Sequence, residues 1–216
     1  MKSYYDTVIF DMDGTLLDSS PGIYNRFNYA LKHFNLPFPD IEPRSLIGPP
    51  LALSFEKYVG LKGAEINEAV DKYREYYSRH GAYEAKPYQG SIDLLRELGN
   101  TGARVALATS KYSVLAEEML RHFKMDHYFQ FLQMSGEREA HSTKKEMIEN
   151  VCEFFGSAKN ATVMIGDTLF DVEGAREAGV EFIGVLYGYG SRKEMEEAGG
   201  RAFASDTDEL RKMLIV

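Results

Sequence analysis

Short apolar runs alternate along this chain with stretches whose apolar residues recur at helical spacing, and this alternation restricts the fold more than any other feature. The runs are rich in Val, Ile and Ala, and helical patterns separate them. Strands that alternate with helices predict an α/β fold built on a doubly wound, mostly parallel sheet. The predicted strands are 7–10, 104–109, 161–165 and 181–185, with weaker ones at 131–134 and 201–203.

The segment 19–86 breaks the alternation. It contains no convincing strand, and its apolar residues fall at helical spacing, as at Phe27 and Leu31. Prolines at 37, 39, 43, 49 and 50 punctuate its connections. We therefore predict a helical domain over 19–86, inserted after the first strand of a core made from 1–18 and 87–216. Because both ends of the insert must lie near the end of the first strand, we expect it to form a lid, or cap, over that end.

Composition narrows the choice of partner. The chain has 216 residues, enough for one or two domains, and its net charge of −8 argues against a surface built for nucleic acid or an anionic membrane. Cys152 is the single cysteine, so an intrachain disulfide is impossible. The first ten residues are too polar for a signal peptide, and no apolar run approaches the roughly 20 residues that a membrane helix needs. We expect a cytoplasmic protein, monomeric or homodimeric, that binds a small molecule.

Two carboxylates follow the first predicted strand directly, in the stretch VIFDMDGT at 8–15. Asp11 and Asp13 stand one residue apart, where like charges repel and each is costly to desolvate. In an open parallel sheet, ligands bind beyond the carboxyl ends of the strands, where the strand order reverses. Other polar residues stand at comparable places. Thr109, Ser110 and Lys111 stand at the end of the strand 104–109, and Gly166, Asp167 and Asp171 follow the strand 161–165. Lys144 and Lys145 begin the helix that precedes 161–165.

These residue types suit phosphate chemistry. An oxygen-only cluster of carboxylates fits a hard cation, and Mg²⁺ is common where phosphate is handled. Hydroxyl groups such as those of Thr109 and Ser110 can donate to phosphate oxygens, and a lysine can hold both a phosphoryl group and a carboxylate. An aspartate can act as a nucleophile and form an acyl-phosphate. Gly14 lets the backbone turn tightly and approach a ligand.

The motifs together resemble those of the haloacid dehalogenase superfamily. DMDGT at 11–15, ALATSK at 106–111, a lysine at 144 and GDTLFD at 166–171 match its four motifs in order and spacing. The resemblance covers the whole chain, and the helical insert resembles the superfamily's cap. IGPPL at 47–51 and GYG at 188–190 resemble the phosphoglycolate phosphatase-like branch. The resemblance implies an Mg²⁺-dependent phosphatase acting through an aspartyl-phosphate on a small phosphorylated metabolite; the alternatives are a 5′-nucleotidase or a pyrophosphatase of the same superfamily.

Roles follow by position from that resemblance. Asp11 would be the nucleophile and Asp13 the general acid and base, with Thr109 and Lys144 as the other catalytic residues. Mg²⁺ would be held by Asp11, by the backbone carbonyl of Asp13 and by Asp167, and Asp171 would hold the metal's water or Lys144. The residues expected to bind substrate are Gly14, Thr15, Ser110, Lys111 and Arg44.

Several of these assignments keep an alternative. The site lysine is expected to be Lys144, and Lys145 would then be a solvated helix residue. The alternative is that Lys145 is the site lysine. Asp171 can also be a helix N-terminal acid favoured by the helix dipole. Lys111 either reaches the phosphate or lies on the surface, and Arg44 meets either a distal anionic group of the substrate or water.

Three other functions compete. A β-phosphoglucomutase-like phosphotransferase would carry a histidine at or beside Ile23, and none is near. A true dehalogenase would lack the pair of acids and need no metal, so Asp13 and Asp167 argue against it. A binding or regulatory protein on this fold would have lost a catalytic residue, whereas every expected one is present. The sequence therefore favours the phosphatase.

Overall fold

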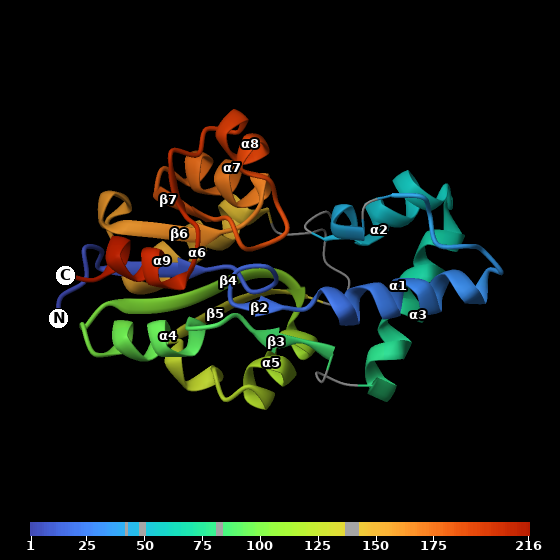
Figure 1. Cartoon of the computed structure of the whole chain (residues 1–216), viewed down its shortest axis with the longest axis horizontal. Coiled ribbons are helices and arrows are strands. Elements are labelled where there is room, and N and C mark those ends of the chain that lie inside the picture. The colour runs from blue at the N-terminus through green and yellow to red at the C-terminus, as the bar shows by residue number, and fades with distance from the viewer. Residues whose placement is uncertain (42, 48–50, 81–83, 137–142) are drawn as a thin grey trace. The chain divides into compact units, whose positions relative to one another are not determined.

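A computed structural model describes the chain over residues 1–41, 43–47, 51–80, 84–136 and 143–216, without the side chains of 43, 44 and 77–80. The chain divides into two compact units, shown in Figure 1. One contains Met1–Asp18 and Pro87–Val216, and the other contains Ser19–Lys86. Each unit has its own hydrophobic core, so they are described separately.

The larger unit is built on a six-stranded sheet in the order β5-β4-β1-β6-β7-β8, and every pair of neighbours is parallel. The predicted α/β fold with a doubly wound parallel sheet is confirmed. The chain leaves β1 for β4 and β5 on one side and returns to β6 on the other, so the strand order reverses at β1. The strands are β1 Thr7–Phe10, β4 Arg104–Tyr112, β5 Phe131–Ser135, β6 Thr162–Gly166, β7 Glu181–Val185 and β8 Ala202–Ala204.

Helices cover both faces of this sheet (Figure 1). α6 packs on α7 and on β4, whereas α4 and α5 contact β4 from the other side and α4 also meets α9. Successive strand residues point to opposite faces and both faces are covered, so the central strands are apolar over most of their length and β1 is fully buried. The helices are α4 Ser91–Gly99, α5 Ser113–His122, α6 Lys144–Phe155, α7 Leu169–Ala178, α8 Arg192–Glu197 and α9 Thr207–Leu214, with short 3₁₀ turns η4 Asp126–Tyr128 and η5 Lys159–Ala161.

One core cluster fixes the helices that carry the site. Ile9 of β1 and Met164 of β6 pack with Ile148 of α6 and Ala175 of α7, all without solvent exposure. Burying such side chains stabilises the fold by about 1.5–3 kcal/mol each for the larger ones. The first turns of α6 and α7 are therefore held against the ends of β1 and β6.

β4 is longer than the sequence predicted. The apolar run ends at Thr109, but the strand continues to Tyr112 with a register shift against β5 between these two residues. Such a bulge re-aims side chains near the end of a strand. The polar residues Ser110 and Lys111 therefore belong to the end of the strand and not to a following loop.

The smaller unit is helical. α1 Ser20–His33 and α3 Ala64–His80 are its long helices and contact each other, with η1 Pro43–Leu46, α2 Leu51–Ser54 and the π-helical turn η2 Phe55–Val59 between them. Phe27 stacks on Phe55 with ring centroids 4.5 Å apart, and both are fully buried. The described residues of this segment are therefore mainly helical, as the sequence predicted.

The two connections to the insert are paired with each other. β2 Leu17–Asp18 and β3 Lys86–Pro87 form a two-stranded sheet, and Tyr88 N donates to Leu16 O at 3.0 Å. The chain therefore leaves the larger unit and returns to it at one place.

Within the described part of the chain, no helix combines the length and the apolar character that crossing a bilayer requires.

Candidate active site

Polar side chains gather at the carboxyl ends of β1, β4 and β6, where the strand order reverses. Asp11 directly follows β1, and its backbone N–H donates to Ile165 O at 2.9 Å, which extends the pairing of β1 with β6. Asp167 directly follows β6, and Asp171 lies in the first turn of α7. This placement is what the topology of an open parallel sheet predicts for a ligand site.

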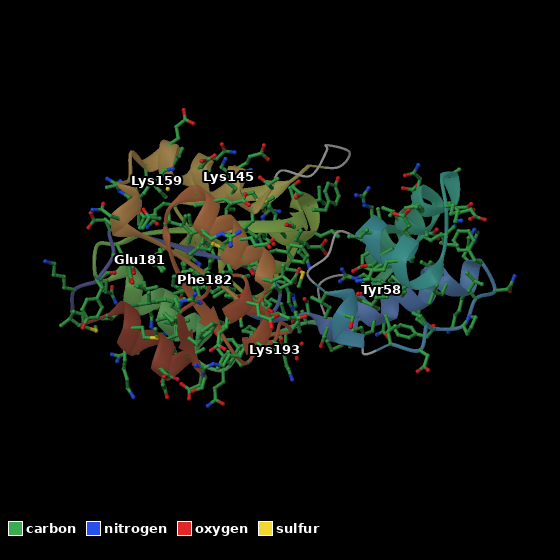
Figure 2. The ribbon with its side chains drawn as sticks, turned by 90° about the horizontal axis from the view of Figure 1, so that it is seen from above. Tyr58, Lys145, Lys159, Glu181, Phe182 and Lys193 are labelled. Atoms are coloured by element: carbon green, nitrogen blue, oxygen red, sulfur yellow. The ribbon has the colours of Figure 1, made fainter. Side chains whose placement is uncertain are left out.

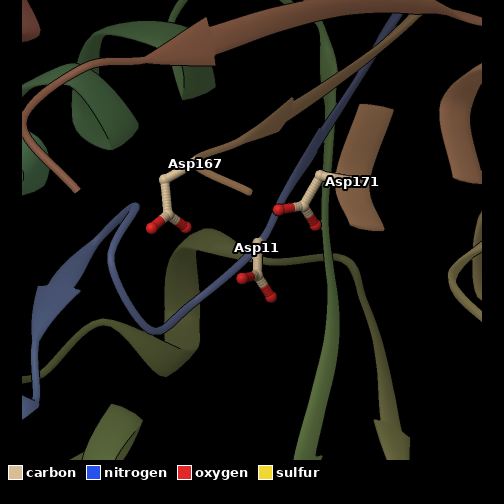
Figure 3. Close-up of side chains that lie close together, drawn as sticks. All are labelled: Asp11, Asp167 and Asp171. Carbon is tan, nitrogen blue, oxygen red and sulfur yellow. The ribbon is translucent and has the colours of Figure 1, made fainter. Parts of the chain in front are cut away.

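Three carboxylates converge there (Figure 3). Oxygen atoms of Asp11, Asp167 and Asp171 lie within 4.8 Å of one another. Asp167 is fully buried and Asp171 almost so, at 0% and 1% exposure, while Asp11 is 9% exposed. Three acids in so small a buried space require a positive charge to offset their repulsion and desolvation.

Lys144 supplies part of that charge. Its Nζ lies 3.0 Å from Asp11 Oδ1 and 2.9 Å from Asp171 Oδ1, and it donates to Ala108 O at 2.9 Å. Lys145 is only partly buried and lies near the periphery of the larger unit in Figure 2. It is therefore Lys144 that reaches the acids.

Local sequence explains how Lys144 arrives there. Thr143 caps α6, since its side chain accepts from Glu146 N at 3.2 Å while Glu146 Oε2 accepts from Thr143 N at 2.7 Å. Such a capping box fixes the start of a helix. A Cβ added to Gly174 of α7 would lie 2.6 Å from Lys144 Cβ. The absence of a side chain at Gly174 thus lets the first turn of α6 lie against α7.

The pKa values follow this geometry. Burial raises the pKa of Asp11 to about 6; Lys144 opposes the shift, and Asp171 and Asp13 add to it. Burial and repulsion from Asp171 and Asp11 raise the pKa of Asp167 well above its usual range. Burial disfavours the ammonium of Lys144, but the attraction of Asp11 and Asp171 outweighs it and raises the pKa. The lysine stays charged, and one lysine does not balance three acids.

The donor set therefore fits a divalent cation. Its ligand atoms are all oxygens, as hard cations such as Mg²⁺ prefer, and the three acids have the single ammonium of Lys144 between them. Asp11 and Asp167 are the best placed to hold the ion.

Asp171 has other partners. Its Oδ1 pairs with Lys144 at 2.9 Å, and its Oδ2 accepts from Thr168 N at 3.1 Å and from the Thr168 hydroxyl at 2.8 Å. The contact with Thr168 closes a capping box at the start of α7. Asp171 thus combines two of the roles expected for it, as an acid at a helix N-terminus and as a partner of Lys144.

Asp13 is held by Lys111. Lys111 Nζ donates to both carboxylate oxygens of Asp13 at 2.8 Å, and the side chains are 7% and 19% exposed. Lys111 is therefore neither a surface residue nor aimed only at substrate. The bulge at the end of β4 turns it toward Asp13.

Thr109 and Ser110, near the end of β4, carry hydroxyl groups. Thr109 is 2% exposed, and its Oγ1 accepts from Lys111 N at 3.2 Å, so the hydroxyl proton can still be donated to a ligand. Ser110 is exposed.

Asp167 is enclosed by residues for which sequence reasoning gave another role or none. The Thr15 hydroxyl donates to Asp167 Oδ1 at 3.1 Å, and Tyr189 N donates to Oδ2 at 2.7 Å. Gly14 has φ +86°, a backbone conformation that favours glycine, and a Cβ there would clash with Asp167. The signal for the Tyr189 contact is the GYG motif just after β7, which places small residues at the same edge of the sheet.

Two expectations concern residues beyond these. The side chain of Arg44 and residues 48–50 of IGPPL lie outside the described residues. The assignment of Arg44 to substrate binding stays a prediction.

The comparisons with known proteins now bear on this site. The family model of the haloacid dehalogenase-like hydrolases matches residues 8–185. This range runs from β1 to β7 and contains every site residue described above except those of the GYG motif. The chain belongs to this family. The resemblance inferred from the four motifs is confirmed.

Relatives agree on phosphate chemistry but not on substrate. A 5′-nucleotidase of Pseudomonas aeruginosa is 36% identical over 211 residues, which cover 97% of this chain and 96% of the relative. A phosphoglycolate phosphatase of Agrobacterium fabrum is 27% identical over 187 residues, with 84% and 80% covered. A solved structure of a predicted phosphatase from Clostridium acetobutylicum has a TM-score of 0.89 and 36% identity, with 96% and 97% covered. The family and these names support a phosphatase, as the motifs predicted.

Proposed function

We propose that this chain is an Mg²⁺-dependent phosphomonoester hydrolase that forms an aspartyl-phosphate on Asp11 and acts on a small phosphorylated metabolite. The observation that carries the proposal is the contact of Lys144 with Asp11 at the end of β1, beside Asp167 and Asp171. A buried carboxylate between an ammonium and further acids is arranged to attack a phosphoryl group.

In the first half of the reaction, a carboxylate oxygen of Asp11 forms a bond to phosphorus and the ester P–O bond breaks. The leaving oxygen takes a proton from Asp13. Lys144 pairs with the phosphoryl oxygens as well as with Asp11, and Thr109 donates its hydroxyl proton to one of them. The products are the free alcohol and phosphorylated Asp11.

In the second half, Asp13 takes a proton from water as the water oxygen attacks phosphorus. The bond between phosphorus and Asp11 breaks, and inorganic phosphate leaves. Both halves use Asp13, first as acid and then as base.

Asp11, Asp167 and the carbonyl of Asp13 would hold the metal. When bound, Mg²⁺ would neutralise negative charge on the acids and on the phosphoryl oxygens. It would thus supply positive charge at the site of a chain whose net charge is −8.

The unit Ser19–Lys86 is proposed to be the cap that selects the substrate. The strand-end residues handle only the phosphoryl group, so the part of the substrate beyond phosphorus must be recognised elsewhere. A phosphoglycolate-like substrate is the first candidate, on the strength of the IGPPL and GYG motifs.

Hydrolysis of nucleoside 5′-monophosphates is the second candidate, favoured by the 36% identity with a 5′-nucleotidase over nearly the whole of both chains. Comparing kcat/KM for 2-phosphoglycolate, nucleoside 5′-monophosphates and pyrophosphate would separate these candidates.

The deciding experiment measures phosphate release from p-nitrophenyl phosphate by the purified protein with Mg²⁺ and with EDTA. Release is expected only with Mg²⁺, and protein quenched in acid during turnover should gain the mass of one phosphoryl group on the peptide that contains Asp11. Phosphate release without any such labelled peptide would rule out the covalent route.

A further inference from the structure

The geometry points to a metal-positioning role for Thr15 and for the loop Leu186–Gly190. Together they hold both carboxylate oxygens of Asp167 in one orientation, so that this residue is set to bind the metal ion before the ion arrives. The inference rests on the proposed metal-dependent function, and it moves Thr15 from substrate binding to a different role.

Both oxygens of Asp167 have a donor. The Thr15 hydroxyl donates to Oδ1 at 3.1 Å and Tyr189 N donates to Oδ2 at 2.7 Å. Asp167 and Thr15 are both 0% exposed, so bulk solvent does not compete for either bond. Rotation of the carboxylate would break both bonds at once, and an acid with two fixed donors keeps a defined direction for its remaining lone pairs.

Glycines bring the loop close enough for this contact. A Cβ at Gly188 would clash with Asp167 Cβ and with Gly14 O, and a Cβ at Gly190 would clash with the carbonyl oxygen of Asp167. Any larger residue at these positions would push the loop away from Asp167, and with it the amide of Tyr189. The close approach of the loop to Asp167 therefore explains why glycines stand on both sides of Tyr189.

Tyrosine side chains anchor the same loop. The Tyr187 hydroxyl donates to Thr15 O at 3.1 Å, and its ring lies 4.8 Å from that of Tyr88. Thr15 is thus held at its carbonyl by Tyr187 while its hydroxyl holds Asp167. The Tyr189 hydroxyl makes a separate bond, to Asp18 Oδ1 at 3.3 Å.

The hydrogen-bond inventory of Thr15 excludes a simultaneous role in phosphate binding. A threonine hydroxyl has one proton to donate, and in Thr15 that proton goes to Asp167. A fully ionised phosphate oxygen needs a donor. Thr109, whose hydroxyl accepts from Lys111 N, still has its proton to offer.

The test compares Thr15→Val, which keeps the shape but removes the donor, with Thr15→Ser, which keeps the donor. Mg²⁺ binding to the substrate-free protein is measured by calorimetry, with Mn²⁺ followed by electron paramagnetic resonance as a second probe. Thr15→Val should bind both ions on the order of 10-fold more weakly than the wild type, the usual scale for losing a group that orients a metal ligand. Thr15→Ser should bind them nearly as well as the wild type.

A second pair of variants tests the loop. Gly188→Ala should also weaken Mg²⁺ binding, because the added Cβ displaces the loop from Asp167. Tyr189→Phe keeps the backbone amide and removes the hydroxyl that bonds Asp18, so its Mg²⁺ affinity should stay near that of the wild type. If Gly188→Ala does not fold, the Thr15 pair still decides the matter.

Kinetics separate this role from phosphate binding. At saturating Mg²⁺, Thr15→Val should keep the KM for p-nitrophenyl phosphate, while the Mg²⁺ concentration for half-maximal activity rises. A higher KM with unchanged Mg²⁺ affinity would overturn the inference and return Thr15 to the substrate. A wild-type protein that binds no Mg²⁺ would instead refute the proposed function itself, and the inference with it.

Discussion

Asp11, Asp167 and Asp171 share one buried space, yet each has its own set of partners. Lys144 of α6 pairs with both Asp11 and Asp171, Thr168 at the start of α7 also bonds Asp171, and Tyr189 after β7 bonds Asp167. The three acids therefore do not exchange roles. Single substitutions should have distinct effects at each of them.

Asp11→Asn should abolish turnover and leave the fold intact. An amide cannot form the acyl-phosphate, while its volume matches that of the acid it replaces. Steady-state phosphate release and circular dichroism would check this, with Asp93→Asn at an exposed site of α4 as the control that keeps activity. Turnover by a variant shown by mass spectrometry to be free of deamidation would remove Asp11 from the mechanism.

Lys111→Met should lower kcat most for substrates with poor leaving groups. The forked contact holds both oxygens of Asp13, and without it the acid is no longer directed at the leaving oxygen. Loss of general acid–base function typically costs about 10²–10⁴-fold, and disordering Asp13 should cost a part of that. Lys145→Met, which removes the neighbour of Lys144, is the matched control. Equal slowing of p-nitrophenyl and alkyl phosphates would instead mean that Lys111 acts on the phosphoryl group.

In the metal-free protein, the raised pKa of Asp11 should make stability depend on pH. Its ordinary value is 3.8 and its folded value about 6, so the folded state holds the proton more tightly. The contribution of this acid is therefore fully present below pH 3.8 and is lost as pH rises through about 6. In EDTA, Asp11→Asn should gain Tm relative to the wild type over that interval, and Mg²⁺ should narrow the difference. A Tm difference that stays constant across the interval would contradict the shift.

At the scale of elements, periodicity predicted the strands of the sheet and the helices around it, because burial on both faces leaves uninterrupted apolar runs. It missed the end of β4, where Ser110 and Lys111 are polar and yet belong to the strand, since a bulge has no apolar signature. The same reasoning applies to the site. Residues directly after strands could be assigned from topology, whereas the enclosure of Asp167 by Thr15 and Tyr189 depends on close backbone packing that no period encodes.

The start of α6 offers a prediction at this scale. Thr143→Ala removes the side chain that accepts from Glu146 N, and the loss of such a cap costs about 1 kcal/mol. For a chain of this length that lowers Tm by about 2–4 °C. Because Lys144 is the first residue of α6, kcat should fall as well. Thr143→Ser, which can cap the helix in the same way, should restore both properties; a kcat that stays low with serine would point to some other function of the threonine.

On the scale of the whole molecule, the sequence predicted an inserted helical segment from its missing strands and its prolines. Its core could not be predicted in detail, because the stacking of Phe27 on Phe55 joins residues far apart in the sequence. The larger unit was easier to predict, since strands and helices alternate along its sequence and its neighbouring strands are all parallel.

The separate cores predict separate unfolding. Phe27→Ala empties a fully buried site in the helical unit, a change that typically costs about 3–5 kcal/mol. Hydrogen exchange followed by mass spectrometry should show faster exchange in peptides from Ser19–Lys86 and little change in peptides from β1, β4 and β6. Phe154→Ala, at a residue 59% exposed on α6, is the control that should leave both units protected. Uniform loss of protection over the whole chain would mean that the two units unfold as one.

The paired connections β2 and β3 have a consequence for how such a chain can change over generations. Because the insert departs and returns at one point beside Leu16 and Tyr88, its length and sequence can vary without threading new chain through the sheet. Recombination at Asp18 and Lys86 would exchange the whole insert and leave the register of β1 against β4 and β6 as it is. Ancestors and descendants of this protein could thus have acquired new substrates by trading one continuous stretch of gene, while the strand ends that carry the phosphoryl chemistry were inherited intact.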